Sequence, residues 1–211
     1  MQNPHNYLDI YASRHHEIQK CSQVITDGIR NILMDEKIER IDQITGRAKS
    51  IERFGIKAQK KTTDGSFKYR EPLVNIQDQI GVRIVVFYLD DVERTTEVML
   101  KYYKPIEIAD KYPEKHDSFS YVGKHFILFI PDEEKTWGRE ENMFMPSFFE
   151  LQVKTMFQHA WAESEHDLNY KAKNELSFED KRLIAFSAAQ AWGADKVFGE
   201  LTAKYLINNR N

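Results

Sequence analysis

The sequence is poor in cysteine, in long apolar runs and in charge of one sign. Cys21 is the only cysteine among the 211 residues, which excludes an internal disulfide and a thiolate metal cluster. No apolar stretch approaches the ~20 residues that cross a membrane, and residues 1–11 are too polar for a secretory signal. We therefore expect a cytoplasmic protein with no membrane partner.

The charge balance gives no overall electrostatic signal. The formal net charge is −3 although 30% of the residues are charged, so the chain as a whole is not marked as a binder of nucleic acid. Any basic site must be local. Hydrophobic residues make up 41% of the chain, with thirteen Phe and ten Tyr, which is enough to fill the core of one domain with a helical extension.

The N-terminal part of the chain has a helical pattern. Apolar residues at helical spacing predict one or two amphipathic helices over residues 1–34, namely at Ile18, Cys21, Ile25, Ile29, Ile32 and Leu33. Thr45 and Gly46 then break the pattern, and we expect a second helix near Arg47. The polar segment 60–66 should end that helix in a loop.

The middle of the chain alternates strands with helices. Residues 80–88 read as a strand, 92–103 as a helix, 106–109 as a short strand and 126–130 as a strand that Pro131 ends. This order predicts a mixed or parallel sheet. Another strand at 147–154 precedes a helix over 155–171, and a capping box from Ser177 to Asp180 opens a last helix. We expect that helix to be buried through Ile184, Ala191, Ala194, Phe198 and Leu201.

Two ions stand inside apolar strands. Arg83 follows Val82 and precedes the apolar residues 84–87, and Glu150 lies among Phe and Leu residues. A buried ion must be paired or must lie at a working edge of the sheet. Around Glu150 the apolar residues alternate with Glu150, Gln152 and Lys154, so one face is core and the other carries chemistry. The pattern indicates a site for phosphates and a metal.

Several motifs occur in a characteristic order. They are Gly46-Arg47-Ala48-Lys49 with Lys57, Asp78-x-x-Gly81-x-Arg83, Tyr121-x-x-x-His125, Glu150-x-Gln152-x-Lys154-Thr155 and His166-Asp167-Leu168-Asn169-Tyr170-Lys171. In these motifs the chain resembles the synthetase domain of the RelA/SpoT alarmone synthetases, especially the small single-domain kind. The resemblance implies an α/β fold with a five-stranded mixed sheet surrounded by helices, related to nucleotidyltransferases. We divide the chain into an N-terminal helical region (1–45), the synthetase domain (46–171) and a C-terminal helix packed on it (172–211).

The resemblance also implies roles in binding ATP, the pyrophosphate donor. Asp78 and Glu150 would hold Mg²⁺, or Mn²⁺ in its place, and Glu150 could also accept the proton of the attacking hydroxyl. Arg47 and Arg83 would sandwich the adenine, as planar guanidinium groups can, while Lys49 and Lys57 would bind phosphates. The alternatives are a surface carboxylate for Glu150 and a solvated helix face for the lysines.

On the acceptor side, the family stacks a tyrosine on the guanine base. The corresponding residues are Tyr121 and His125, with Lys115, Gln152 and Lys154. The sequence departs from the family pattern nearby, with Ser120 for glycine, Gly123 for serine, Asp117 for lysine, Lys154 for arginine and, in the first motif, Arg53 for serine. The acceptor is therefore less well defined than the donor. The alternative for Tyr121 is a tyrosine that packs at the start of a strand.

The helix 155–171 carries His159, Glu163 and His166 on one face. We reject zinc there, because the spacing is not that of a zinc protease and no cysteine is nearby. His166 and Asp167 should likewise not be taken for the metal pair of the family's hydrolase domain, because the chain is too short to hold that domain.

Three functions fit these observations. The first is an ATP-dependent pyrophosphokinase, a GTP/GDP diphosphokinase-type transferase that makes the stringent-response alarmone (p)ppGpp from GDP or GTP. The second is a toxic relative, with an antitoxin partner, that pyrophosphorylates the 3′ end of tRNA through a local basic track of Lys60, Lys61, Lys68, Arg70, Lys154, Lys171, Lys173 and Arg182. The third is a non-catalytic nucleotide-binding module. The terminal helices could supply contacts of a homo-oligomer. We favour the first.

Overall fold

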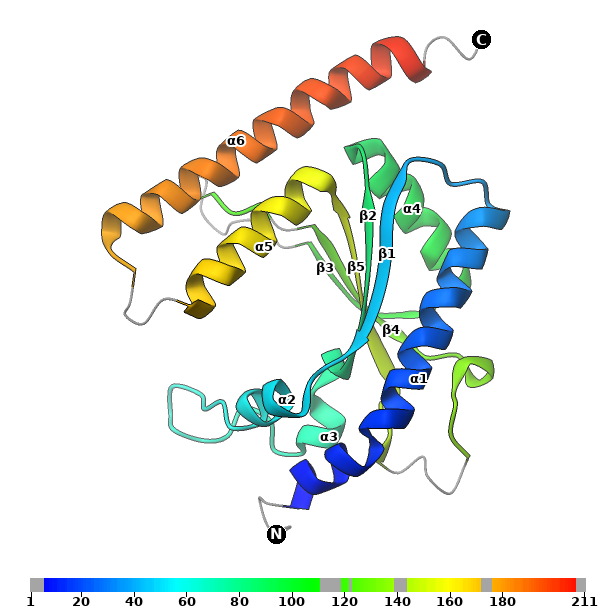
Figure 1. Ribbon diagram of the computed structural model, residues 1–211, viewed down its shortest axis with the longest axis vertical. Helices are drawn as coiled ribbons and strands as arrows, with labels where there is room; N and C mark the ends of the chain where they lie inside the picture. Colours follow the sequence, from blue (N-terminus) through cyan, green and yellow to red (C-terminus); the bar gives the residue numbers. More distant parts are fainter. Residues whose placement is uncertain (1–5, 111–118, 122, 139–143, 172–175, 208–211) are drawn as a thin grey trace.

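A five-stranded mixed sheet forms the centre of the molecule (Figure 1). The computed structural model describes residues 6–110, 119–121, 123–138, 144–171 and 176–207. The strands are β1 (Ile41–Ala48), β2 (Ile80–Val86), β3 (Pro105–Asp110), β4 (Lys124–Phe129) and β5 (Phe148–Thr155), in the spatial order β1-β2-β5-β4-β3. β2 and β5 run parallel, and the other neighbouring pairs run antiparallel. The predicted sheet is confirmed.

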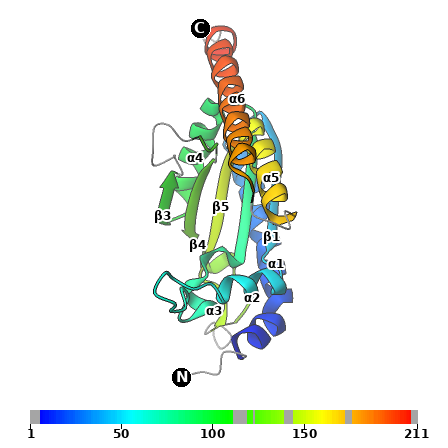
Figure 2. The same ribbon diagram turned by 90° about the vertical axis from the view of Figure 1, so that its left-hand side faces the viewer.

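Helices cover both faces of this sheet. α1 (Asn6–Asp35) and α4 (Leu89–Tyr102) lie on one face, and α5 (Met156–Lys171) lies on the other with α6 (Phe178–Thr202) beside it (Figures 1 and 2). α2 (Ile51–Ala58) and α3 (Pro72–Asn75) sit at one end. Short helical turns complete the fold at η1 (Gln77–Gln79), η2 (Asp132–Glu134) and η4 (Ala203–Ile207).

The core lies between α1 and the sheet. Ile18, Cys21, Ile25, Ile29 and Leu33 of α1 have no exposed surface, so the predicted helical pattern is confirmed from Asn6 onward, as one continuous helix. From the sheet, the alternate residues of β5 that the sequence assigned to the core are also completely buried, namely Phe149, Leu151 and Val153. Their neighbours along β5 must point to the opposite face, because side chains alternate along a strand.

The helix that we expected near Arg47 is a strand. Arg47 lies in β1 and pairs with Gly81 of β2, and the helix begins only at Ile51, where the Ser50 side chain accepts a hydrogen bond from the Arg53 amide. β1 is an edge strand and half of its residues are exposed, so it lacks the alternation that marks a half-buried strand. At Gly46 a Cβ would lie 1.8 Å from Thr26 Oγ1. Because glycine has no Cβ, α1 can pack this close to β1.

The last helix is less buried than its pattern predicted. α6 begins as expected, with a capping box between Ser177 and Asp180. However, Phe198 and Leu201 are each 45% exposed, and the buried residues of the helix are Ala188, Asp195 and Thr202. In Figure 2 the C-terminal half of α6 extends beyond the other elements, so its apolar residues there have no sheet to pack against.

No helix in the described part of the chain combines the length and the apolar character needed to span a membrane.

Candidate active site

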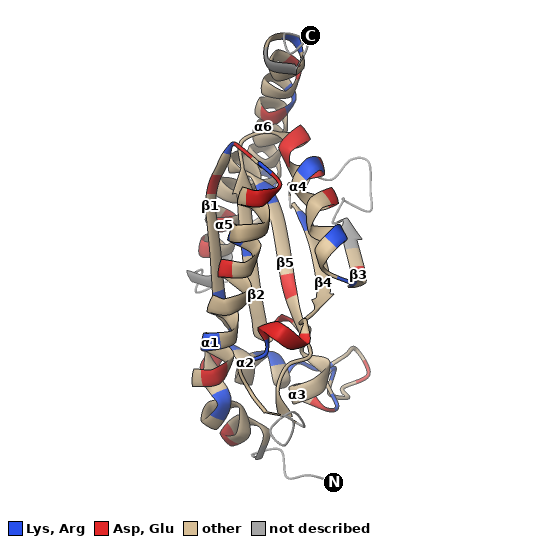
Figure 3. Ribbon diagram, turned by 90° about the vertical axis from the view of Figure 1, so that its right-hand side faces the viewer, with Lys and Arg blue, Asp and Glu red and all other residues tan. Residues whose placement is uncertain are grey.

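The strand register brings the predicted site residues into two adjacent rows on one face of the sheet. One row crosses four strands as Thr45, Arg83, Gln152 and His125, and the next as Arg47, Gly81, Glu150 and Ile127. Both rows lie on the face that α5 partly covers, opposite the core packed under α1. The red segment of β5 in Figure 3 is Glu150, the one acid in that strand. Arg83 and Glu150 are therefore tolerated inside apolar strands because they face a site.

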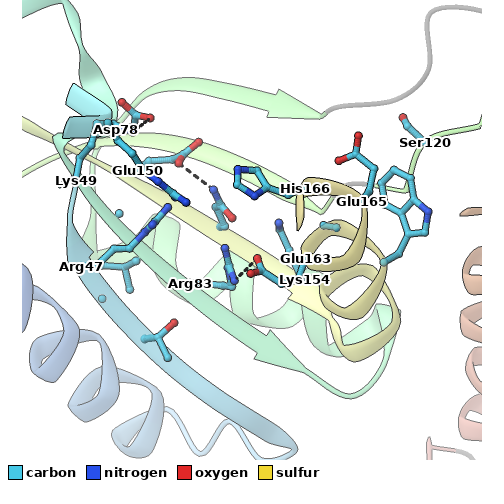
Figure 4. Close-up of a pocket in the computed structure, with 18 residues that line it drawn as sticks. Arg47, Lys49, Asp78, Arg83, Ser120, Glu150, Lys154, Glu163, Glu165 and His166 are labelled. Carbon is cyan, nitrogen blue, oxygen red and sulfur yellow. Dashed lines mark hydrogen bonds and ion pairs between the residues drawn. The ribbon is translucent and has the colours of Figure 1, made fainter. Parts of the chain in front are cut away.

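A cleft of about 700 Å³ opens over these rows (Figure 4). The predicted residues that line it are Arg47, Lys49, Asp78, Arg83, Glu150, Gln152 and Lys154. A smaller pocket of about 170 Å³ is lined by Lys57 and His125 and also by Asp78 and Glu150. The two carboxylates thus lie where the two pockets meet, and Figure 4 shows both at the same end of the cleft.

Asp78 is held by two lysines. Its Oδ2 lies 2.9 Å from the Nζ of Lys49 and 2.9 Å from the Nζ of Lys57, which brings the predicted phosphate ligands to the predicted metal ligand. Its Oδ1 is buried and has no hydrogen-bond partner among the described residues. A buried carboxylate oxygen without a donor is unfavourable, so this atom is suited to a ligand.

Helix α1 fixes Lys49 through its backbone. The Tyr11 hydroxyl donates to the Lys49 carbonyl over 2.7 Å, and His15 Nε2 lies 3.1 Å from the same oxygen. The Tyr11 ring stacks on Phe54 with centroids 3.9 Å apart. Burial, with a smaller contribution from the charge of Asp78, raises the pKa of Tyr11, so its hydroxyl stays a donor. Sequence reasoning missed both α1 residues, since nothing in the sequence links them to position 49.

Each carboxylate oxygen of Glu150 has a nitrogen within hydrogen-bonding distance. Its Oε1 lies 3.0 Å from His125 Nδ1, and its Oε2 accepts a 2.9 Å hydrogen bond from the Gln152 side-chain amide. The Glu150 side chain is 19% exposed and that of His125 is 9% exposed. His125 and Gln152, both predicted on the acceptor side, thus orient the carboxylate.

Arg83 is tied to α5. Its Nη1 lies 2.7 Å from Glu163 Oε1 and 3.3 Å from His159 Nδ1, and His159 Nε2 lies 3.0 Å from the side-chain nitrogen of Gln43. The helix face that invited a zinc interpretation therefore contacts an arginine. Within the described ranges, no group of three or more His, Cys, Asp and Glu side chains is arranged to hold a metal ion.

Tyr121 contacts α6 and lines neither pocket. Its side chain is buried, and its hydroxyl donates to Asp195 Oδ2 over 2.6 Å. The same oxygen accepts a 2.6 Å hydrogen bond from the Thr155 hydroxyl. Burial raises the pKa of Asp195. Ser120, one residue earlier, does line the larger cleft. Sequence reasoning missed Asp195, and Lys115 lies outside the described residues.

The match to a known family accounts for this geometry. The family described as "Region found in RelA / SpoT proteins" matches residues 46–175, well over half of the chain. The chain belongs to the RelA/SpoT family.

The individual relatives of this RelA/SpoT chain share 21% to 27% of its residues. "GTP pyrophosphokinase YjbM" from Bacillus subtilis is 27% identical over 177 residues, covering 82% of this chain and 78% of the relative. The structure of small alarmone synthetase 1 from Bacillus subtilis bound to pppGpp superposes with a TM-score of 0.73 at 21% identity, covering 90% and 95% of the two chains. A GTP pyrophosphokinase family protein from Streptococcus pneumoniae gives a TM-score of 0.67 at 22% identity, with 95% and 93% covered.

The RelA/SpoT match and the fold do not share one boundary. The match begins at Gly46, in the middle of β1, whereas the strand begins at Ile41. α1 lies wholly outside the match, yet it supplies much of the core and both contacts to the Lys49 carbonyl. α6 likewise follows the match and holds Tyr121.

The basic residues proposed as an RNA track are divided between separate places. Lys60, Lys61, Lys68 and Arg70 are exposed on the segment between α2 and α3, where Lys61 and Phe67 form a β-bridge. Lys154 is only 4% exposed and belongs to the cleft. Arg182 is exposed on α6, and Lys173 lies outside the described residues. Among the described positions, burial therefore separates Lys154 from the exposed basic residues.

Proposed function

We propose that the chain is an ATP-dependent pyrophosphokinase that transfers the β,γ-pyrophosphate of ATP to the 3′-hydroxyl of GDP or GTP, which yields (p)ppGpp. The observation that carries this proposal is the position of Asp78 and Glu150 between a large cationic cleft and a smaller second pocket. Such an arrangement can hold two substrates close together, one on either side of the shared carboxylates. The relatives, a GTP pyrophosphokinase and a small alarmone synthetase bound to pppGpp, support the same reaction. A cytoplasmic location, where both nucleotides occur, fits this activity.

The larger cleft suits ATP. Arg47 and Arg83 come from neighbouring strands. Gly81, which pairs with Arg47 and lies two residues before Arg83, has no atom within 4 Å of where a Cβ would be. A purine can enter this space and stack on planar guanidinium groups. Lys49 at the cleft and Lys57 at the adjoining pocket can then neutralise the phosphates. A structure of small alarmone synthetase 1 from Bacillus subtilis contains AMPCPP, an ATP analogue.

Asp78 and Glu150 would hold a magnesium ion. Mg²⁺ takes oxygen ligands, usually one or two carboxylates together with phosphates and water, and the buried Asp78 Oδ1 has no donor among the residues that the structure describes. Bound there, the ion would neutralise charge on the phosphates. The lysines on Asp78 Oδ2 hold that carboxylate in a fixed orientation.

Glu150 is placed to take the acceptor proton. Its two oxygens are fixed by His125 and Gln152, and it borders the pocket that would hold the acceptor. As the 3′-oxygen attacks the β-phosphorus of ATP, its proton passes to Glu150. The bond between the β-phosphorus and the α,β-bridging oxygen breaks, and AMP leaves with that electron pair.

Transfer of label tests this function directly. The chain is incubated with Mg²⁺, γ-labelled ATP and one acceptor at a time, namely GDP, GTP, ATP or bulk tRNA. We expect label in ppGpp and pppGpp with one AMP released per transfer. Label that enters only tRNA would replace the guanine nucleotide by an RNA end, and no transfer to any acceptor would favour a non-catalytic binding module.

A further inference from the structure

The guanidinium of Arg83 is anchored from one side. Its side chain is 22% exposed, and Nη1 is bound by both Glu163 and His159 of α5. Its Nε is buried without a hydrogen-bond partner in the described part of the chain. Hydrogen bonds to a guanidinium lie in its plane, so they restrain the group while leaving its faces available for stacking. This is the arrangement that an adenine-stacking arginine requires.

The contact to Arg83 determines which nitrogen of His159 carries the proton. Arginine only donates, so His159 Nδ1 must accept and the proton must be on Nε2. Nε2–H in turn needs an acceptor, which the Gln43 side chain provides once its amide is rotated to exchange nitrogen and oxygen. Gln43 on β1, His159 on α5 and Arg83 on β2 thus form one chain of hydrogen bonds. This series of hydrogen bonds requires that the imidazole of His159 be neutral.

The surroundings keep this imidazole neutral. Burial and the adjacent Arg83 lower the pKa of His159 from its ordinary 6.5, and Lys154 of β5 acts in the same direction. Glu163 of α5 and Asp42 of β1 oppose the shift without reversing it. If His159 is protonated, an N–H on Nδ1 faces Nη1 of Arg83, and two cations meet where a hydrogen bond was. The anchor of Arg83 is then reduced to Glu163.

We propose that His159 and Glu163 are positioning residues for Arg83, and that ATP binding therefore depends on a neutral imidazole at position 159. This inference rests on the proposed function, since it deepens the donor site. Glu163 is 54% exposed, so its ion pair with Arg83 is screened by water. His159 lies deeper and should contribute more to the orientation of Arg83.

Substitutions at position 159 separate the hydrogen bond from the charge. In His159→Asn, the amide oxygen can take the place of Nδ1 and accept from Arg83, but it does not titrate. In His159→Leu the acceptor is lost, and we expect the KM for ATP to rise about tenfold, as for loss of one charge-assisted hydrogen bond. The kcat and the KM for GDP should stay within about twofold.

The pH profile is the decisive readout. Between pH 7.5 and 5.5 the wild-type affinity for ATP should fall more steeply than that of His159→Asn, because only the wild type gains a proton beside Arg83. ATP itself titrates, but equally in both measurements. His16→Asn, at an exposed histidine of α1, serves as the matched control and should follow the wild-type profile. Identical profiles for wild type and His159→Asn would overturn the proposal.

Binding of a non-hydrolysable ATP analogue, measured by calorimetry, keeps the two proposals separable. It needs no acceptor and no turnover, so it reports on Arg83 even if the chain transfers pyrophosphate to nothing. If ATP binds and His159→Leu does not weaken it, the positioning role is wrong while the proposed function stands. Should His159→Leu not fold, as shown by its thermal melting, Glu163→Ala provides the second variant. It should raise the Kd for the analogue about threefold, and an unchanged Kd would count against the proposal.

Discussion

The donor and acceptor sides of the cleft are positioned by different parts of the molecule. Arg47 lines the cleft from β1, Lys49 from the position directly after β1, and Arg83 from β2. Tyr121 instead directs its hydroxyl to Asp195 of α6, and Phe119 beside it packs edge-on against Trp192 of the same helix. The proposed donor side therefore depends on the sheet, whereas the tyrosine of the proposed acceptor side depends on a helix outside the region that matches the family.

This difference shows where the site is preformed. Residues in paired strands hold their positions by backbone hydrogen bonds, so the sheet itself fixes Arg47 and Arg83. In the conformation described, Tyr121 is buried and lines neither pocket. A stacking role for Tyr121 would require its ring to leave α6, and the free energy of the Asp195 contact would oppose that movement.

The largest expected effect comes from the carboxylates that the two sides share. Asp78→Asn and Glu150→Gln should each lower kcat at least about 1,000-fold, since they remove a metal ligand or the proton acceptor. Their melting temperatures should stay close to that of the wild type, because both residues face the cleft. Glu97→Gln, at an exposed acid of α4 on the opposite face, is the control and should be fully active. Unchanged turnover in Asp78→Asn would refute the assignment.

Filling the space at Gly81 should harm the donor side alone. A Cβ there meets nothing within 4 Å, so Gly81→Val should fold, and its side chain would occupy the floor of the cleft. We expect the KM for ATP to rise about 30-fold, as for the loss of a base-stacking contact of up to about 2 kcal/mol, with the KM for GDP little changed. Gly199→Ala in α6, also with open space, should leave both constants unchanged. Equal effects on both substrates would contradict the division into two sides.

Two variants of Tyr121 examine the acceptor side. Tyr121→Ala removes the ring and should raise the KM for GDP about tenfold, because stacking on a base contributes about 1 to 3 kcal/mol. Tyr121→Phe keeps the ring and loses only the hydrogen bond to Asp195, so the KM for GDP should not rise. Its unfolding free energy should drop by about 1 kcal/mol. If Tyr121→Ala weakens ATP as much as GDP, the tyrosine only packs at the start of β4.

The smallest effect lies away from both sides, at Glu134 in η2. Burial raises the pKa of Glu134 to about 6, although a hydrogen bond from Tyr103 opposes the shift. Because the folded pKa exceeds the ordinary 4.5, this group stabilises the fold below pH 4.5 and loses that contribution as pH rises through 6. Glu134→Gln should therefore be more stable than the wild type by about 1 kcal/mol at pH 7, after allowance for partial solvent exposure.

Urea unfolding of the wild type and of Glu134→Gln at pH 4.5 and at pH 7 measures this difference in stability. The two proteins should be equally stable near pH 4.5, and their kcat values should agree at pH 7. A lower stability of Glu134→Gln at pH 7 would show that the carboxylate is ionised and well paired.

The sequence predicted those parts of the site that lie in regular, half-buried strands. An arginine in the apolar strand around Ile84 and an acid in the alternating strand around Leu151 are conspicuous, because burial makes each ion costly without a partner. β1 escaped prediction because half of its residues are exposed, and Arg47 was placed in a helix for that reason. Asp195, Tyr11 and the contacts of His159 could not be predicted, since they bind residues 38 or more positions away in the sequence.

The hydrogen bonds from α1 to the Lys49 carbonyl limit which segments can be exchanged between relatives. The hydroxyl of Tyr11 contacts the Lys49 carbonyl and the hydroxyl of Thr26 lies against Gly46, so both contacts fall within four residues at the end of β1. A chimera that takes its first helix from one parent and its strand from another must therefore match at two points at once. In chimeras joined in the turn between α1 and β1, Lys49 would be misplaced. We expect such chimeras to fold but to bind the triphosphate of ATP weakly.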